Sequence, residues 1–268
     1  MKPITLYSFL TVLAAGLFGL ASCQASSQIQ NNDPVYTSIS PKATASPTHL
    51  RPNPTEAPTI QATPDPVEEQ LQNLYNASLK YLADTEEKTW QVARNLGYAP
   101  LGGYPSNMCG PLAISILKDA AIVSRSAALH DFWLLNPEED GTLLQSTFPV
   151  DHFEWIHTSI SIDKIDYNQI PLRAGDLVYI YSGYQGDYSH VLAVTRVDAE
   201  GKAYSVTSNY TKDGFVVEEY LLYNPNDPGV GLFYAWTNPA NKKLGLTGFG
   251  GLDIWRPTRL PYYADGLP

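Results

Sequence analysis

The chain has 268 residues, 44% of them hydrophobic, and carries a formal net charge of −10 at pH 7. This length suffices for one sizeable hydrophobic core, and the composition is that of a globular protein. The acidic balance argues against a nucleic-acid-binding protein and against a surface that binds anionic lipids, because both ligands would be repelled. The two cysteines, Cys23 and Cys109, lie in such different sequence settings that a disulfide framework is not indicated.

The first 22 residues have the parts of a secretory signal. Lys2 supplies a positive charge, residues 4–20 form an apolar run, and the small residues Ala21 and Ser22 precede Cys23. A single membrane-spanning helix is an alternative, but the run is shorter than the ~20 residues that a bilayer requires and no positive stop follows it. We therefore expect residues 1–22 to be a signal peptide that exports the protein.

The end of this segment, Leu20-Ala21-Ser22-Cys23, resembles the lipobox of bacterial lipoproteins. In that family the cysteine is diacylated and becomes the mature N-terminus, whereas a plain signal peptide would leave no lipid. The resemblance implies that Cys23 is the lipidation site and that the exported protein is anchored to the cell membrane through its lipid. Since an acylated cysteine cannot form a disulfide, we expect Cys109 to carry a reactive thiol.

Residues 23–66 are dominated by Pro, Ser, Thr, Asn and Gln and show no hydrophobic period. Such a segment cannot bury enough apolar area to offset the entropy lost on ordering, and its prolines keep it extended. The alternative is a segment that wraps on the folded domain. We expect residues 23–66 to be a disordered tether between the membrane and a domain at residues 67–268.

Helix signals dominate the first half of that domain. Pro66 can occupy a first helical turn, Glu68 and Glu69 are favoured at the positive end of a helix dipole, and Gly97 is suited to end a helix. Apolar residues recur at helical spacing after Pro66. The pattern predicts one helix that begins at Pro66 and others over residues 86–96, 109–123 and 130–135.

From residue 170 onward the pattern changes to that of β-strands. Residues 147–167 are mixed, and the chain has no internal repeat. Helices followed by an antiparallel sheet are typical of the α+β class, which is the fold class we expect. We expect a hairpin turn over residues 198–201 and strands over residues 177–181, 190–197, 203–208, 215–222 and 252–255.

Cys109 begins a predicted helix after a loop rich in glycine. The unpaired N–H groups and the partial positive charge of a helix N-terminus lower the pKa of a thiol and can hold a developing oxyanion. Gly110 would let a substrate approach closely, and Pro111 needs no N–H in a first turn. A buried, inert cysteine is the alternative, but this setting favours Cys109 as a nucleophile.

His190 begins a predicted strand and could exchange a proton with the Cys109 thiol. If the turn covers residues 198–201, positions 190 and 209 are equally distant from its centre and lie opposite one another. Position 209 is Asn209, whose side chain could hold the imidazole in the required tautomer. Cys109, His190 and Asn209 are therefore the candidate catalytic residues.

Two groups of motifs resemble known families. The segment Asn107-Met108-Cys109-Gly110-Pro111-Leu112-Ala113 is similar to the Cys-Gly-Pro-x-Ala start of the nucleophile helix in papain-like bacterial peptidases of the bacteriocin-leader-processing type. Three later segments resemble, in their order, the C-terminal half of CHAP and NlpC-type amidase domains: Gly175-Asp176-Leu177-Val178, His190-Val191-Leu192-Ala193-Val194 and Ser208-Asn209. The similarity covers roughly residues 85–222.

This resemblance implies a papain-like cysteine peptidase fold, in which the nucleophile helix packs on an antiparallel sheet. It implies a monomer that hydrolyses amide or peptide bonds without a metal or cofactor, with peptidoglycan or a peptide as substrate. Two positions depart from the family pattern. Gly103 stands where a Gln often completes the oxyanion hole, with Asn107 and Tyr104 as candidate substitutes, and Thr207 stands where CHAP domains often carry an acidic residue.

The other histidines and the tryptophans have less specific settings. His152 and His157 lie five residues apart near acidic residues, but this spacing is not that of a known metal site, so we expect no metal there. We expect His130 to be a surface or core residue. We expect the tryptophans to belong to the core and its rim, with some lining a groove for a peptide or glycan: Trp133, Trp155, Trp236 and Trp255.

Three alternatives to a peptidoglycan hydrolase stay open at this point. The same fold could act on protein substrates as a protease or acyltransferase. The missing Gln is compatible with an inactive papain-like domain that binds wall or peptide ligands. A transglutaminase-like enzyme is the weakest alternative, because that family uses Asp where Asn209 stands.

Overall fold

The computed structural model describes residues 65–97, 105–184, 189–212 and 214–266. The predicted signal peptide and nearly all of the predicted tether lie outside these residues. None of the described helices is long and apolar enough to cross a membrane. The described helices are α1 (Pro66–Leu79), α2 (Glu86–Asn95), α3 (Cys109–Asp119), α4 (Gly141–Thr147), α5 (Leu232–Trp236) and α6 (Pro239–Leu244), with 3₁₀ turns η1 (Pro105–Met108) and η2 (Leu129–Phe132).

Helix α1 begins at Pro66 as predicted, and α2 matches its predicted range to within one residue. Asp65 caps α1 by accepting a 2.9 Å hydrogen bond from the Val67 N–H. Thr85 caps α2 in the same way through the Lys88 N–H. Gly97 follows α2 with a φ of +87°, a conformation that glycine adopts without steric cost.

Two further helix predictions were too long. Helix α3 ends at Asp119 rather than near residue 123, because Ala121 adopts a left-handed φ of 59° that no continuing helix tolerates. The predicted helix over residues 130–135 is only the 3₁₀ turn η2. Helices α4, α5 and α6 were not predicted, since each is at most seven residues long and has too few turns to show a periodic pattern.

The strands form two antiparallel sheets, which confirms the α+β class. The first has the order β1-β7-β2-β3 and the second the order β4-β5-β6. Their bounds are β1 (Phe153–Thr158), β2 (Leu177–Ser182), β3 (His190–Ala193), β4 (Arg196–Val197), β5 (Ala203–Thr211), β6 (Gly214–Tyr223) and β7 (Thr247–Pro257). The strand predicted over residues 190–197 is thus divided between the two sheets.

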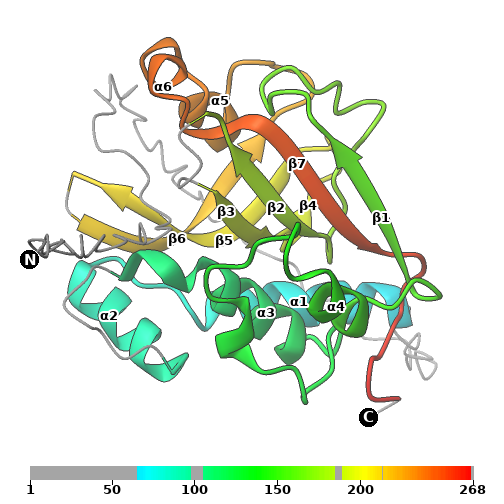
Figure 1. Ribbon diagram of the computed structural model, residues 1–268. Helices are drawn as coiled ribbons and strands as arrows, with labels where there is room; N and C mark the ends of the chain where they lie inside the picture. The colour runs from blue at the N-terminus through cyan, green and yellow to red at the C-terminus, as the bar shows by residue number, and fades with distance from the viewer. Residues whose placement is uncertain (1–64, 98–104, 185–188, 213, 267–268) are drawn as a thin grey trace, which may run out of the picture.

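Strands β2, β3 and β7 of the four-stranded sheet are buried on both faces over most of their length. Figure 1 shows α1 to α4 gathered along one side of the sheets and α5 and α6 at the other. On the side of α3, Val191, Ala193 and Trp255 belong to one core cluster. On the side of α5, Leu192 and Ile254 belong to a second. This alternation follows from the two-residue period of a strand.

A buried ion pair links β2 to β7 at the Gly-Asp motif. The Arg256 guanidinium donates from Nε to Asp176 Oδ1 at 2.9 Å and from Nη2 to Oδ2 at 2.7 Å. The Asp176 carboxylate also accepts a 2.8 Å hydrogen bond from the Arg173 N–H. Because a buried carboxylate needs such partners, the Asp176 of this motif is explained by its structural role at the start of β2.

Candidate active site

Cys109 lies at the first position of α3, as predicted, and is 5% exposed. It belongs to the core cluster on the α3 side of the sheet. We expected the next residue, Gly110, to leave space for a substrate. The structure shows that it does not. A Cβ at Gly110 would lie 2.0 Å from the main-chain oxygen of Phe132, so the space above this glycine is filled by η2.

The Cys109 sulfur is disulfide-bonded in this structure, which contradicts the expectation of a thiol. The only other cysteine of the chain, Cys23, lies outside the described residues. A disulfide and an acylated sulfur exclude each other at Cys23. The oxidation state of Cys109 is therefore tied chemically to the fate of Cys23.

The direction of α3 places Cys109 at a defined end of the sheet. Just beyond the C-terminal end of α3, Ile122 lies beside Gly175, two residues before β2 begins. Leu177 of β2 pairs with Ala193 at the far end of β3. Since α3 packs against β3, its N-terminus points toward the other end of the sheet, where His190 begins β3.

The His190 side chain is buried, with two neighbours that fix its ring. Its Nε2 atom lies 2.9 Å from Oγ1 of Thr207. The ring packs edge to face on Trp236 of α5, with 5.0 Å between the ring centroids. Burial lowers the pKa of His190 to about 4, so that the imidazole is neutral at pH 7 and can accept a proton.

The prediction that Asn209 lies opposite His190 is wrong, because β3 and β5 belong to different sheets and do not pair. The turn is also one residue longer than assumed. Asp198 N donates to the Lys202 main-chain oxygen at 3.0 Å, so the loop has three residues, 199–201, instead of the two assumed. Gly201 takes the left-handed conformation that such a loop requires, with a φ of 80°. Arg196 pairs with Tyr204, and the hairpin is centred on residue 200.

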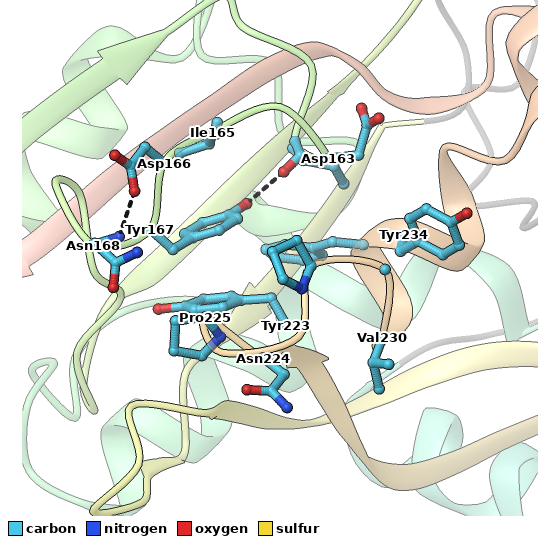
Figure 2. Close-up of a pocket in the computed structure, with 14 residues that line it drawn as sticks. Asp163, Ile165, Asp166, Tyr167, Asn168, Tyr223, Asn224, Pro225, Val230 and Tyr234 are labelled. Carbon is cyan, nitrogen blue, oxygen red and sulfur yellow. Dashed lines mark hydrogen bonds between the residues drawn. The ribbon is translucent and has the colours of Figure 1, made fainter.

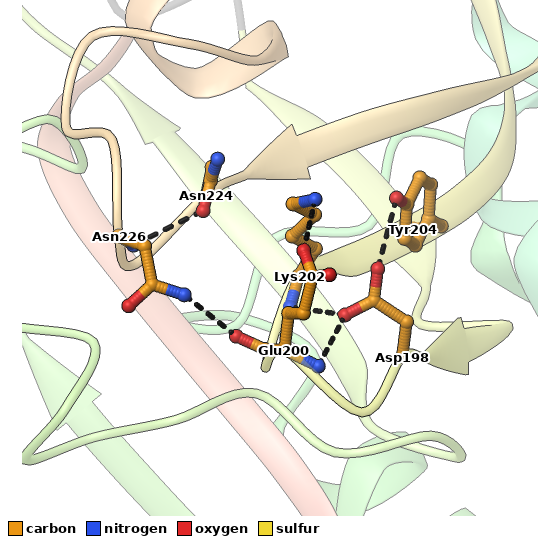
Figure 3. A network of polar contacts seen from close by, with 6 residues as sticks. All are labelled: Asp198, Glu200, Lys202, Tyr204, Asn224 and Asn226. Carbon is orange, nitrogen blue, oxygen red and sulfur yellow. Dashed lines mark hydrogen bonds and ion pairs between the residues drawn. The ribbon is translucent and has the colours of Figure 1, made fainter.

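Polar contacts around Asp198 hold this longer loop, as Figure 3 shows. Its Oδ1 atom accepts hydrogen bonds from the N–H groups of Glu200 and Lys202 at 2.9 and 3.0 Å. Its Oδ2 atom accepts one from the Tyr204 hydroxyl at 3.2 Å. The Asn226 amide supports the loop from outside by donating to the Glu200 main-chain oxygen at 3.1 Å.

Between β4 and β3 the chain no longer follows the regular hydrogen-bond ladder with β5. The Thr195 N–H bonds the Tyr204 oxygen, and the Ser205 hydroxyl bonds the Ala193 oxygen at 2.7 Å. This change of register brings Thr207 rather than Asn209 to His190. Asn209 is buried two residues further along β5, on the strand segment near Tyr220.

His190 and Cys109 share one end of the sheet but belong to different surroundings. Cys109 shares its core cluster with Val191 and Ala193 of β3. The ring of His190 packs on Trp236, which belongs to the cluster on the opposite side. The residues predicted around the oxyanion hole are divided: Asn107 lies in η1 directly before Met108, while Gly103 and Tyr104 lie outside the described residues.

The other three histidines that the structure describes each contact a different aspartate. His130 and His152 each lie next to an adjacent aspartate, with Nε2 at 2.6 Å from Asp131 and at 3.3 Å from Asp151 respectively. His157 instead contacts Asp253 of β7. Among the described residues, no three His, Cys, Asp or Glu side chains are grouped in a way that could hold a metal ion.

A His–Asp–Tyr cluster that was not predicted lies on the α3 side of the sheet. His157 Nδ1 lies 2.6 Å from Asp253 Oδ1, and the Tyr181 hydroxyl donates to Asp253 Oδ2 at 2.7 Å. The three residues come from β1, β7 and β2, which are far apart in the chain. Only the alternation of Trp155 and His157 in a strand could have drawn attention to this cluster.

A pocket of about 180 Å³ lies on the α5 side of the sheet, opposite the His157–Asp253–Tyr181 cluster. Figure 2 shows the rings of Tyr167 and Tyr223 beside one another, and they are stacked with centroids 3.8 Å apart. The Tyr167 hydroxyl donates to the Ile162 main-chain oxygen at 3.0 Å. Burial raises the pKa of Tyr167 well above its usual value. These contacts are those of a packed support for α5 rather than of a reactive centre.

Comparison with known proteins gives no relative from which a function could be transferred. No protein-family model, curated protein or solved structure gives a significant match to this chain.

Proposed function

We propose that this protein is a cell-envelope thiol hydrolase of papain-like fold, which cleaves amide bonds with Cys109 as nucleophile and His190 as base. The substrate class is peptidoglycan stem peptides or cross-bridges, reached from a lipid-anchored position at the membrane. One observation carries the proposal. The N-terminus of α3, where Cys109 lies, points to the end of the sheet at which His190 begins β3.

The third role in this site falls to Thr207 rather than Asn209. Its hydroxyl is 2.9 Å from His190 Nε2 and can fix the tautomer of the ring, which leaves Nδ1 for proton exchange. Thr207 occupies the position at which the resembling CHAP domains carry an acidic residue. A neutral hydroxyl does not stabilise an imidazolium as a carboxylate would, so a lower rate than that of a Cys-His-Glu site is expected.

The chemistry follows the usual two steps of a thiol hydrolase. His190 takes the proton from the thiol, and the thiolate attacks the carbonyl carbon. The C–N bond breaks, the amine leaves with the proton from His190, and an acyl thioester remains on Cys109. Water adds to the thioester with His190 as base, the carboxylic acid is released and the thiol is restored.

This mechanism requires the Cys109 sulfur as a thiolate, whereas it is disulfide-bonded in the structure. A dithiol reductant would convert the disulfide to two thiols and become a disulfide itself. We therefore expect the oxidised protein to be inactive and the reduced protein to be active. Reversible activation by dithiothreitol distinguishes this site from one that does not use the sulfur.

The test is incubation of the purified protein with peptidoglycan sacculi, with and without dithiothreitol, followed by mass spectrometry of the released fragments. For an unprocessed chain with Cys109 oxidised, we expect new amine and carboxyl termini only in the reduced sample, and none with Cys109→Ala or His190→Ala. Iodoacetamide should label reduced Cys109 faster than a model thiol, and His190→Ala should remove the difference. Equal labelling rates together with no released fragment would refute the proposal.

A non-catalytic wall-binding domain is the second candidate, favoured by the packing of His190 against Trp236 on the side opposite α3. Binding to insoluble peptidoglycan that Cys109→Ala does not change, without any released fragment, would support it. Casein cleavage in place of peptidoglycan cleavage would instead identify a protease directed at proteins.

A further inference from the structure

A pocket of about 470 Å³ opens on the α3 side of the four-stranded sheet, between α4, β1 and β7. Its volume lies within the range of small-molecule binding sites. The described residues that line it include neither Cys109 nor His190 nor Thr207. The pocket is therefore separate from the proposed hydrolytic centre.

Two phenylalanines and two tryptophans are among the residues that line this pocket. Phe148 packs edge to face on Phe153 at 5.2 Å and lies 6.0 Å from Trp255, with all three rings buried. Trp155 differs from them, because 61% of its surface is exposed. Its ring lies 6.0 Å from that of His157 at the rim. A large exposed indole beside a lined pocket provides an open π face for a ligand.

The polar groups of the pocket favour a ligand that donates hydrogen bonds. Asp253 is 2% exposed and already accepts from Tyr181 and His157. His157 contacts Asp253 through Nδ1, which leaves Nε2 as the ring nitrogen that can contact a ligand. This atom has no hydrogen bond to the described residues, and the His157 side chain is 49% exposed. The Glu138 carboxylate adds two further acceptor atoms to the lining.

The charge at this pocket is negative. Burial raises the pKa of Tyr179, which lies next to Tyr181, and the charges of Asp253, Glu138 and Asp140 raise it further. The described lining residues include no Lys or Arg. A negative field excludes anionic ligands, and it attracts cations toward aromatic faces that themselves favour cations.

We propose that this pocket binds an organic cation, that is, an ammonium group carried on an apolar body. The ammonium lies against the Trp155 face and near the Glu138 carboxylate, and the apolar body fills the aromatic interior. A polar group on the ligand forms a hydrogen bond with His157 Nε2. Neutral glycans, which also stack on exposed tryptophans, are the alternative that the test distinguishes.

The test uses two ligands of equal shape that differ in charge. These are 3-(trimethylammonio)phenol and 3-tert-butylphenol, each titrated into the purified protein by calorimetry and by quenching of tryptophan fluorescence. We expect the cation to bind roughly tenfold more tightly than its neutral counterpart, as a cation–π contact with a nearby carboxylate provides. Raising the salt concentration should weaken binding of the cation and leave binding of the neutral phenol unchanged.

Matched variants locate the site. Glu138→Gln should weaken binding of the cation roughly fivefold and leave the neutral phenol unchanged, while Glu139→Gln, next to it but not in the lining, should change neither. Trp155→Leu keeps an apolar side chain at an exposed position. It should also weaken binding of the cation several-fold. Far-ultraviolet circular dichroism checks that each variant is folded.

Three results would overturn the proposal. These are equal affinity for the two phenols, no binding of either at about 10 mM, and binding of the cation that Glu138→Gln and Trp155→Leu leave unchanged. Binding of N,N′-diacetylchitobiose without any preference for the cation would replace it with a glycan site. None of these outcomes depends on hydrolytic activity, so this proposal and the proposed function can fail separately.

Discussion

At the scale of single residues, the burial of His190 has a consequence for stability that does not depend on catalysis. Burial lowers its pKa in the folded protein to about 4, from 6.5 in the unfolded chain. Between these two pH values the unfolded chain binds a proton that the folded protein does not. The free energy of unfolding should therefore fall as the pH drops from 6.5 to 4, by about 3 kcal/mol for this group.

The measurement is urea unfolding at pH 7 and pH 4.5 for the wild type and for His190→Gln. The carboxylates titrate in both proteins, so the difference between the two pH slopes isolates His190. We expect the wild type to lose about 2–3 kcal/mol more than the variant over this interval. Equal pH slopes would show that His190 is accessible to protons in the folded protein.

Thr207 offers a second prediction at this scale, because it rather than Asn209 contacts the histidine. Thr207→Val keeps the shape of the side chain and removes the hydroxyl that positions the ring. If the protein hydrolyses amides as proposed, kcat should fall about tenfold with little change in KM, and Thr207→Ser should restore it. Asn209→Ala should reduce kcat less. A larger loss from Asn209→Ala would return the third role to that residue.

At the scale of elements, Gly110 is explained by the contact between α3 and η2. A Cβ at this position would meet the Phe132 main-chain oxygen at 2.0 Å, and a main-chain atom cannot move aside as a flexible side chain can. We expect Gly110→Ala to lower the free energy of unfolding by about 3 kcal/mol. Loss of activity in this variant would therefore not identify Gly110 as a substrate-binding residue.

Gly141 provides the matched control. It begins α4, and a Cβ there would meet no atom within 4 Å. Gly141→Ala should raise the free energy of unfolding by about 0.5 kcal/mol, because alanine loses less entropy than glycine on entering a helix. Urea unfolding of the two variants tests both expectations. Similar effects of the two substitutions would refute this explanation of Gly110.

The same elements show what the sequence could predict and where its information ended. The start of α1 at Pro66 and strands such as β2 follow from a few neighbouring residues, and both were predicted. The hairpin after β4 was located, but β3 lies in a different sheet from β5, so counting from the turn did not identify the partner of His190. The cluster of His157, Asp253 and Tyr181 requires the pairing of three distant strands, which no local pattern contains.

At the scale of the whole molecule, the chemistry of the two cysteines connects localisation with activity. Two acyl chains on Cys23 would give a stable membrane anchor, which one chain would not. The same modification would prevent Cys23 from taking part in a disulfide. Membrane anchoring and the thiol form of Cys109 are therefore expected to occur together in the mature protein, whereas an unprocessed chain can be oxidised.

The last prediction tests this connection in the full chain, produced in a bacterium that processes lipoproteins. The wild type should enter the detergent phase on Triton X-114 separation, and Cys23→Ser should remain in the aqueous phase. Mass spectrometry of the wild type should find a diacylglyceryl group on Cys23 and a Cys109 that reacts with N-ethylmaleimide without reductant. A wild type in the aqueous phase, with Cys23 and Cys109 linked in its peptide map, would contradict both lipidation and the thiol form. The proposal of a lipid anchor on Cys23 would then be refuted. Reduction of the disulfide would become the only route by which Cys109 could act as a nucleophile.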